Sequence, residues 1–377
     1  MKQIARIIST YTADTMGVCS ALFELGGMTV MHDASGCNST YNTHDEPRWY
    51  DTDSLVFISG LSEIDAVTGN DGKLIDDIVK AAKDLHPAFI GIAGSPIPMM
   101  TGMDMPAVAK SVEQRTGITS FGFETNGMHS YLSGASMAFK ALAERMLIRD
   151  VKPTAKGVNI LGATPLDFSV NGSIESVKRL LIKNGFDIVS CWAMGSSLQE
   201  IMNAGSAQVN LVVSYAGLEC ARHLQQVFGM PYVVAMPTGE AFNRQIINAL
   251  RLSMADGKNR IPYLERPIDP GAQIAVLGEC VSAGSMATAL TEKCGKAVKV
   301  ICPLETEACL LAQGDSFESW ESEIEEALKG IDILIADPLY KPIFSGEKFI
   351  PRPHEAFSGR IFRRDIVDMV DDLRIDI

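Results

Sequence analysis

The chain has 377 residues, a formal net charge of −13 and 46% hydrophobic residues. This length predicts two or three lobes, because domains usually contain about 100–200 residues, and the composition excludes a disordered chain. The negative charge, without a basic cluster, excludes a nucleic-acid backbone as the main partner. We expect a cytoplasmic protein, since the N-terminus lacks a secretory signal and no apolar run reaches membrane-spanning length.

Short apolar β-rich runs alternate with longer amphipathic segments along the chain, which predicts an α/β fold with buried parallel strands. Residues 157–191 and 271–302 both follow the order strand, polar loop, helix, strand, as a βαβ crossover requires. The predicted strands span residues 29–32, 55–59, 88–93, 157–162, 187–191, 209–214, 232–235, 273–277, 298–302 and 331–336.

Proline-containing breaks near residue 152 and at 267–270 divide the chain into Rossmann-like lobes, each a mainly parallel sheet flanked by helices. We predict three such lobes and a Pro-rich C-terminal segment that returns to the first lobe. The predicted boundaries are 1–152, 153–268, 269–340 and 341–377.

Two early cysteines are the strongest chemical signal. Cys19 stands at the head of a predicted helix, and Cys37 follows a strand and the polar turn of MHDASGC. In a protein without secretory context, thiolates on a helix start and a strand-end loop favour iron–sulfur ligation over a disulfide. Core packing is the alternative, because free cysteine is among the most buried residue types. None of the eight cysteines forms a CxxC pair, which argues against a zinc ribbon.

Polar loops after predicted strands supply candidates for a cavity where strand ends converge. The segment GFETNGMHSYLSG contains Glu124 and His129, although a solvated loop explains them as well. The chain has neither a GxGxxG fingerprint nor a phosphate loop, so we do not expect it to bind ATP itself. The expected cavity residues are His32, Asp33, Asn38, His44, Glu124, Asn126, His129 and His354.

Three segments, GCNSTYNTHDE, ISGLSEIDAVTGNDGKLIDDI and QVNLVVSYAGLECARHLQQVFGMPYV, resemble motifs of the nitrogenase component 1 superfamily. The resemblance extends over nearly the whole chain. This superfamily includes the nitrogenase molybdenum–iron protein subunits, their cofactor-assembly scaffolds, and protochlorophyllide and nickel-sirohydrochlorin reductases.

The resemblance implies that Cys19 and Cys37 are the first two cysteines that hold an interface cluster. The family's third cysteine corresponds to Ser95 in GSPIP, which argues against an eight-iron cluster. Two thiolates from each of two chains would satisfy one shared 4Fe-4S cluster, in a homodimer or with a related subunit. Gly36 of the Gly-Cys loop and Ser95 are assigned to cofactor binding, with a structural hydroxyl as the alternative for Ser95.

A second departure concerns the family's catalytic centre. The segment that matches its His-Cys-Tyr motif is Val213-Ser214-Tyr215, so the thiolate ligand is absent and Ser214 is assigned to cofactor binding. His354, in PRPHEAFSGRIF, matches the family's cofactor histidine and is assigned a catalytic role with Glu124 and His129. A hydrogen-bonded histidine without that role is the alternative.

The resemblance therefore implies a reductase component that receives electrons from an ATP-dependent partner resembling the nitrogenase iron protein. Without the cysteine we do not expect dinitrogen as the substrate. A small substrate or a tetrapyrrole-like group would take its place, and a second metal or tetrapyrrole cofactor stays open. The alternatives are a non-catalytic scaffold for cluster or cofactor assembly, and a metal-free module that binds a small molecule.

Overall fold

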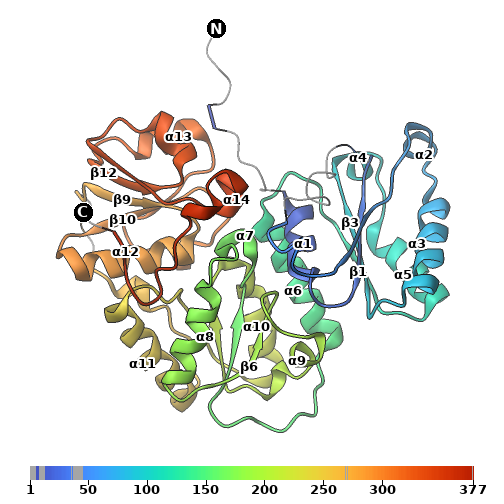
Figure 1. Cartoon of the computed structure of the whole chain (residues 1–377), viewed down its shortest axis with the longest axis horizontal. Coiled ribbons are helices and arrows are strands. Elements are labelled where there is room, and N and C mark those ends of the chain that lie inside the picture. The colour runs from blue at the N-terminus through green and yellow to red at the C-terminus, as the bar shows by residue number, and fades with distance from the viewer. Residues whose placement is uncertain are drawn as a thin grey trace.

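The computed structural model describes residues 6–7, 13–34, 36, 46–267, 269, 271–375 and 377. They form three lobes, each built on a parallel sheet with helices on its faces (Figure 1). The predicted α/β class with three Rossmann-like sheets is thus confirmed. No helix within the described ranges is long and apolar enough to cross a membrane.

The first lobe contains a four-stranded parallel sheet with the order β2-β1-β3-β4. Strands β1 and β3 are buried along their whole length, as continuous apolar runs predict. The elements are α1 Asp14–Leu22, β1 Met28–His32, β2 Leu55–Ile58, α2 Glu63–Thr68, α3 Asp71–Leu85, β3 Ile90–Gly94, α4 Pro96–Met100, α5 Met105–Thr116, β4 Ser120–Phe123 and α6 Tyr131–Met146.

The second lobe repeats this arrangement, with the order β6-β5-β7-β8. Its helices begin at local signals: in α9, for example, Ser197 and Glu200 form a capping box. The elements are β5 Gly157–Leu161, α7 Pro165–Phe168, α8 Ser173–Lys183, β6 Asp187–Cys191, α9 Leu198–Met202, η2 Ala204–Ser206, β7 Val209–Val212, η3 Tyr215–Gly217, α10 Leu218–Phe228, β8 Tyr232–Val234 and α11 Glu240–Asp256.

The third lobe has a five-stranded parallel sheet with the order β11-β10-β9-β12-β13. The predicted βαβ units, β5-α8-β6 and β9-α12-β10, are both confirmed by parallel pairing. The elements are η4 Pro262–Glu265, β9 Ile274–Leu277, α12 Cys280–Cys294, β10 Val298–Cys302, η5 Ala308–Leu310, β11 Ser316–Phe317, α13 Glu321–Ala327, β12 Ile333–Ala336, η6 Pro338–Ile343, β13 Lys348–Pro351, α14 Glu355–Ser358, η7 Gly359–Ile361 and η8 Arg363–Asp365.

The C-terminal segment adds β13 to the third sheet beside β12 and then runs along the second and third lobes. It also meets the first lobe, where the ring centroids of His354 and Tyr131 lie 6.2 Å apart. Its return to the first lobe stays a prediction. Asn171 Nδ2 donates to the carbonyl of Ile366 at 3.2 Å, and the Gly239 N–H donates to that of Met369 at 3.0 Å. These bonds tie the segment to the second lobe because they satisfy its backbone carbonyls there.

In each sheet the strand order reverses once, and the carboxyl ends of the strands on either side of the reversal carry polar residues. Asp33 and Ser95 follow β1 and β3, and Ser214 follows β7 next to the β5–α7 loop. In the third sheet Glu279 and Asp337 follow β9 and β12. Ligands of open parallel sheets bind at such reversals.

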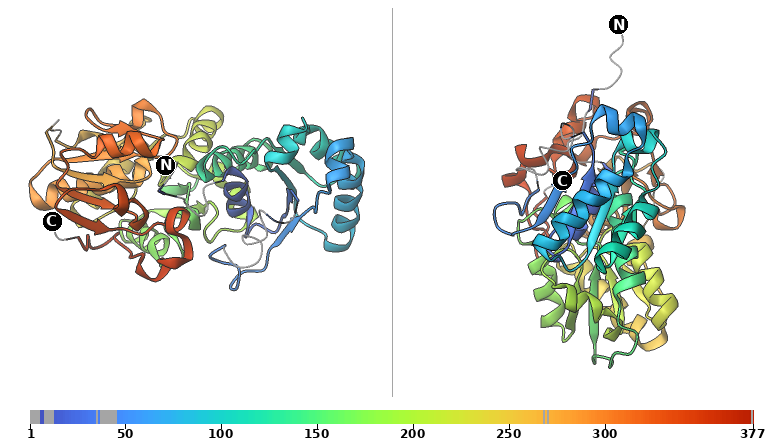
Figure 2. Two further views of the ribbon diagram at one scale, coloured as in Figure 1. Left: turned by 90° about the horizontal axis from the view of Figure 1, so that it is seen from above. Right: turned by 90° about the vertical axis from the view of Figure 1, so that its right-hand side faces the viewer.

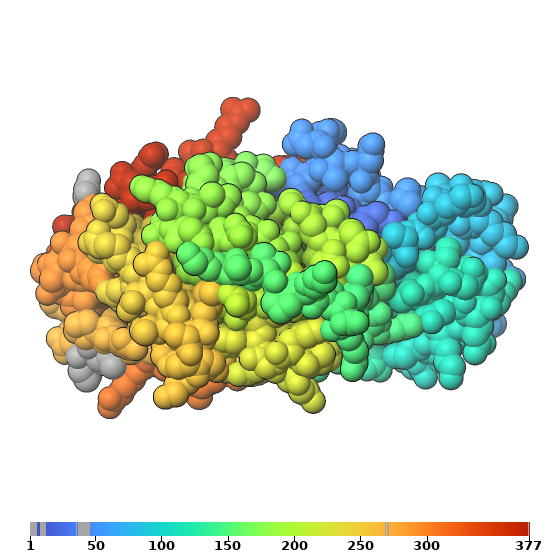
Figure 3. Space-filling model, turned by 90° about the horizontal axis from the view of Figure 1, so that it is seen from below, coloured from blue at the N-terminus to red at the C-terminus, as the bar shows by residue number. Residues whose placement is uncertain are grey.

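Helix α6 joins the first two lobes, since it packs on α1 and on α10. A Cβ added to Gly17 would lie 1.9 Å from the Tyr131 carbonyl oxygen, and one added to Gly134 would lie 1.8 Å from that of Asp14. The two helices therefore touch backbone to backbone. Seen from above, the first and third lobes lie at opposite ends of the molecule (Figure 2), and from below the second lobe fills the space between them (Figure 3).

Candidate functional site

Asp167, in the first turn of α7, is the centre of a polar network between the lobes. Tyr131 from the first lobe donates its hydroxyl to Asp167 Oδ1 at 2.5 Å, and Ser214 donates to Oδ2 at 2.7 Å. His354 Nε2 lies 3.4 Å from Oδ1, and the Asp167 side chain is only 3% exposed. These donors compensate for the burial of the carboxylate, which is otherwise costly.

The hydrogen bonds of His354 define which ring nitrogen carries the proton. Nδ1 accepts from the Ala356 N–H at 3.2 Å, so the neutral ring is protonated on Nε2, the atom that faces Asp167. Asp337 holds the histidine backbone in place, because its Oδ2 accepts from the His354 N–H at 2.8 Å and from Ser358 at 2.7 Å. The imidazole thus points to the centre of the molecule.

Burial and charge also shift the pKa of two further groups in the network. Burial and the charge of Asp167 raise the pKa of Tyr131 well above its usual value, so the phenol stays protonated. Burial and the same charge also raise the pKa of Glu279. The Glu279 carboxylate accepts backbone N–H groups of Val281 at 3.0 Å and Ser282 at 2.8 Å, at the start of α12, and of Tyr215 at 3.0 Å.

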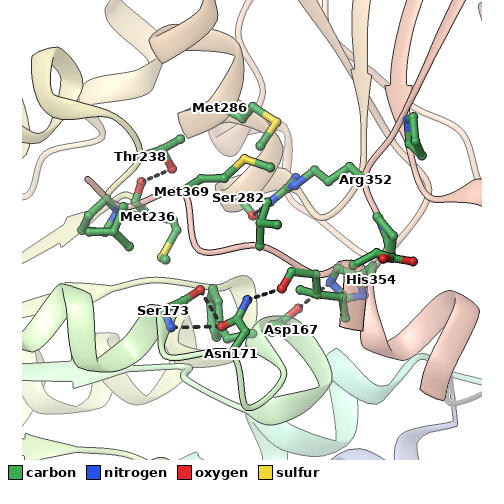
Figure 4. A pocket seen from close by; sticks show the side chains of 18 residues that line it. Asp167, Asn171, Ser173, Met236, Thr238, Ser282, Met286, Arg352, His354 and Met369 are labelled. Carbon is green, nitrogen blue, oxygen red and sulfur yellow. Dashed lines mark hydrogen bonds and ion pairs between the residues drawn. The ribbon is translucent and has the colours of Figure 1, made fainter. Parts of the chain in front are cut away.

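A cavity of about 60 Å³ lies beside this network, between the second lobe, the third lobe and the C-terminal segment. His354 and Asp167 form one side, and Arg352 and Ser282 form another (Figure 4). Arg352 Nη2 donates to Ser282 Oγ at 2.8 Å, and burial lowers the pKa of Arg352 to about 10. The remaining wall includes the methionines Met236, Met286 and Met369.

The residues of this cavity do not fit a metal–sulfur cofactor held by a cysteine and a histidine. Ser214 stands where the family resemblance places the thiolate, and its hydroxyl is engaged by Asp167. Asp167 itself lies between Ser214 and His354. Within the described ranges, no group of three or more His, Cys, Asp and Glu side chains is arranged to hold a metal ion. The site is therefore suited to proton chemistry.

Cys19 lies in the middle of α1 rather than at its head, and it is fully buried. Burial and the charge of Glu46 raise the pKa of the thiol. Since the thiolate is the ligand form, a cluster would have to displace this proton. Cys37 lies outside the described residues, as do Asn38 and His44, so the predicted pair of ligands stays a prediction.

Ser95 has an observed partner at the reversal of the first sheet. Its hydroxyl donates to Asp33 Oδ1 at 2.7 Å, and both residues are buried. The neighbouring His32 has Nδ1 2.8 Å from Ser59 Oγ, and burial lowers its pKa. Gly36 is exposed. Ser95 is thus hydrogen-bonded within the fold, and its cofactor role, like that of Gly36, stays a prediction.

The structure does not bring Glu124 and His129 to His354. Glu124 is exposed and lines a groove between α5 and α6, because it follows the edge strand β4. The His129 side chain is 56% exposed, with Nδ1 3.8 Å from Glu305. Asn126 Oδ1 accepts from the Met128 N–H at 2.8 Å in its own loop. The expectation that one cavity collects these residues is corrected, and the catalytic roles of Glu124 and His129 stay predictions.

Sequence reasoning missed Tyr131, Asp167, Glu279 and Arg352. Glu279 follows β9 after a single glycine, and Asp167 follows β5 within the same loop and helix start. The rule that ligands bind at the reversal of strand order would have selected both, had the strand order been known. Tyr131 and Arg352 offer no such signal, because their positions depend on how the lobes meet.

The family model described as "Nitrogenase component 1 type Oxidoreductase" matches residues 14–261. The nitrogenase iron-molybdenum cofactor biosynthesis protein NifE of Clostridium pasteurianum is 32% identical over 180 residues, covering 47% of this chain and 38% of the relative. The nitrogenase molybdenum-iron protein alpha chain of the same organism is 26% identical over 182 residues, covering 47% and 33%. The chain thus spans less than half the length of these curated relatives.

One subunit of the light-independent protochlorophyllide reductase of Rubrivivax gelatinosus is 24% identical over 194 residues, covering 48% of this chain and 34% of the relative. The solved structure "Nitrogenase Cp1 at pH 6.5" shares the fold, with a TM-score of 0.61 at 16% identity, over 92% of this chain and 85% of that chain. From the family match, which covers more than half of its residues, we conclude that the chain belongs to the nitrogenase component 1 type oxidoreductases.

Proposed function

We propose that this protein is a cytoplasmic nitrogenase-like reductase component that reduces a small substrate other than dinitrogen in the cavity beside His354. The observation that carries the proposal is the network around Asp167, in which a phenol, a serine hydroxyl and an imidazole meet one carboxylate. The family match supports the oxidoreductase class. The serine at the thiolate position argues against metal-bound chemistry in this cavity.

His354 is the proposed proton donor. It lines the cavity and carries its proton on Nε2 when neutral. The Asp167 carboxylate lies 3.4 Å from Nε2 and orients the imidazole. Tyr131 and Ser214 keep this carboxylate oriented, so that its charge faces the imidazole.

Electrons are proposed to arrive through a 4Fe-4S cluster shared by two chains and held by Cys19 and Cys37 of each. When bound, the cluster would supply single electrons at low potential, and an ATP-dependent partner resembling the nitrogenase iron protein would replenish them. The position of Cys19 supports this route, because α1 packs directly on α6, whose first residue is Tyr131. Either a homodimer or a heterodimer with a related subunit provides the second pair of thiolates.

The test is the iron and sulfide content and the electron paramagnetic resonance spectrum of anaerobically purified protein. We expect about four iron atoms per dimer and a reducible signal, which Cys37→Ala removes. Cys220→Ala is the matched control, because Cys220 is fully buried in α10 of the second lobe. A well-folded wild-type protein without iron would refute the proposal.

A second candidate function is a scaffold for cluster or cofactor assembly. The 32% identity to a cofactor biosynthesis protein over 180 residues favours it. A scaffold would transfer its cluster to an acceptor protein, and His354→Gln would not affect the transfer. A reductase would instead lose turnover in His354→Gln while keeping its iron.

A further inference from the structure

Arg352 differs from Arg48 and Arg266, two deeply buried arginines of this protein. The Arg48 side chain, 7% exposed, pairs with Glu46 at 2.7 Å, and the Arg266 side chain, 2% exposed, pairs with Asp315 at 2.5 Å. Arg352 is partly buried, yet no carboxylate of the described residues lies within ion-pair distance of it. Its side-chain partner is the neutral hydroxyl of Ser282. A guanidinium removed from water without an anion is costly to the fold.

The carboxylates whose charge acts on Arg352 already accept hydrogen bonds from other groups. Asp167 and Glu279 attract Arg352 through space. Asp167, however, is occupied by Tyr131, Ser214 and His354, and Glu279 by three backbone N–H groups. Arg352 therefore has donor capacity left for an anion from outside the chain.

The backbone presents Arg352 rigidly to the cavity. It directly follows β13 and lies between Pro351 and Pro353, whose rings fix the backbone angle φ on both sides. In Figure 4 the side chain reaches from the third lobe towards Ser282, while Asp167 and His354 lie on the opposite side of the cavity. The thioether side chains of Met286 and Met369 lie on the side of the guanidinium and Ser282, away from Asp167 and His354.

We propose that this cavity binds a small organic monocarboxylate, whose carboxylate pairs with Arg352 and Ser282 and whose short chain lies against the methionines. The inference rests on the proposed function in one respect: an acid of this class that carries a carbon–carbon double bond is the substrate class of that reductase, which adds two electrons and two protons to the double bond. A planar guanidinium matches a carboxylate with two parallel hydrogen bonds.

Size and charge select this class of anion. A cavity of about 60 Å³ holds about four to six water-sized groups, as many as the non-hydrogen atoms of acetate to butyrate. The carboxylate of Asp167, which lines the cavity, disfavours a second negative charge on the ligand, as in phosphate or a dicarboxylate. Methionine side chains adapt to a short aliphatic chain.

The experiment compares butyrate with butyramide, its uncharged amide of the same shape, by calorimetric titration of the anaerobically purified full-length protein. We expect butyrate to bind and butyramide to bind at least about 10-fold more weakly, because the charged pair is lost. Arg352→Gln should weaken the binding of butyrate by about 10- to 100-fold, and Arg352→Lys should weaken it by less. Arg244→Gln is the control, because Arg244 is 68% exposed on α11.

Three results would overturn the proposal: no binding of butyrate to the wild-type protein, equal binding of butyrate and butyramide, or undiminished binding in a folded Arg352→Gln. If Arg352→Gln does not fold, Ser282→Ala should still weaken the binding of butyrate. An unchanged affinity of Ser282→Ala for butyrate would overturn the site. Binding of uroporphyrin without binding of butyrate would show that the carboxylate belongs to a tetrapyrrole and would overturn the small-acid assignment.

The same titration separates this inference from the proposed function. Cys37→Ala should bind butyrate like the wild type, because Arg352 lies in the third lobe. A wild-type protein that binds butyrate but contains no iron therefore refutes only the proposed cluster. Retained iron without butyrate binding refutes only the substrate class.

Discussion

The hydroxyl of Tyr131 allows a quantitative test of the central network. Tyr131→Phe removes the 2.5 Å hydrogen bond to Asp167 and changes little else, because the ring is fully buried and keeps its packing. A hydrogen bond to a charged group contributes about 1.5–3 kcal/mol. In a chain of 377 residues this lowers the melting temperature at neutral pH by about 2–4 °C.

The difference in melting temperature between the wild type and Tyr131→Phe should disappear at alkaline pH. The pKa of Tyr131 is raised in the folded state, so this tyrosine contributes its full stability below its unfolded pKa of about 10. Above that pH the unfolded chain loses the proton first, and the wild-type protein loses about 1.4 kcal/mol per pH unit from this residue. Tyr131→Phe has no such proton. The two melting temperatures should therefore meet at about pH 11–12.

The assay is differential scanning calorimetry from pH 7 to 12 on both proteins. Tyr50→Phe is the control, because Tyr50 is 83% exposed, and it should follow the wild type throughout. A constant difference between wild type and Tyr131→Phe up to pH 12 would show that the phenol is not held neutral beside Asp167. Equal melting temperatures at neutral pH would show that the bond adds no stability.

Three further predictions concern packing, buried charge and the proton donor. Gly134→Ala should lower the free energy of unfolding by at least about 3 kcal/mol, because its Cβ would lie 1.8 Å from the Asp14 carbonyl oxygen. Thermal unfolding measures this loss. Gly72→Ala on α3 is the neutral control, because its Cβ would meet only Asn70, at 3.8 Å. Arg266→Met should cost about 3–5 kcal/mol, because the buried charge of Asp315 then keeps only the backbone N–H groups of Val300 and Ala312 as partners. Adding Asp315→Asn, which removes the charge and keeps an acceptor, should recover part of this loss in the same measurement. His354→Gln should keep the iron content and the affinity for butyrate within about 2-fold but abolish electron transfer to the substrate, as followed by reoxidation of the reduced protein.

The sheets are predictable from the sequence because buried parallel strands are continuous apolar runs. The strands that sequence reasoning misses are edge strands with weaker signals: β4 is Ser-Phe-Gly-Phe, β11 has only two residues, and β13 ends in Pro351. A proline is tolerated there, since an edge strand need not donate a hydrogen bond on its outer side. The same edge strand holds the C-terminal segment on the third sheet before His354 reaches Tyr131 of the first lobe.

The central site is only half predictable. Ser214 and His354 follow from the family resemblance, and the structure places both beside Asp167. Tyr131 and Asp167 stand 36 residues apart, and their contact depends on the docking of α6 against the second lobe. No local periodicity encodes such a contact between lobes. Glu124 and His129 lie away from the centre because they follow the edge strand β4, which does not border the reversal of strand order.

The glycine contacts between α1 and α6 fix the position of one helix relative to the other. With Gly17 against the Tyr131 carbonyl and Gly134 against that of Asp14, neither helix can slide along the other without a backbone collision. The helix that carries Cys19 is thereby fixed against the helix whose first residue, Tyr131, donates its hydroxyl to Asp167. The central network and the first lobe thus share one closely packed helix pair.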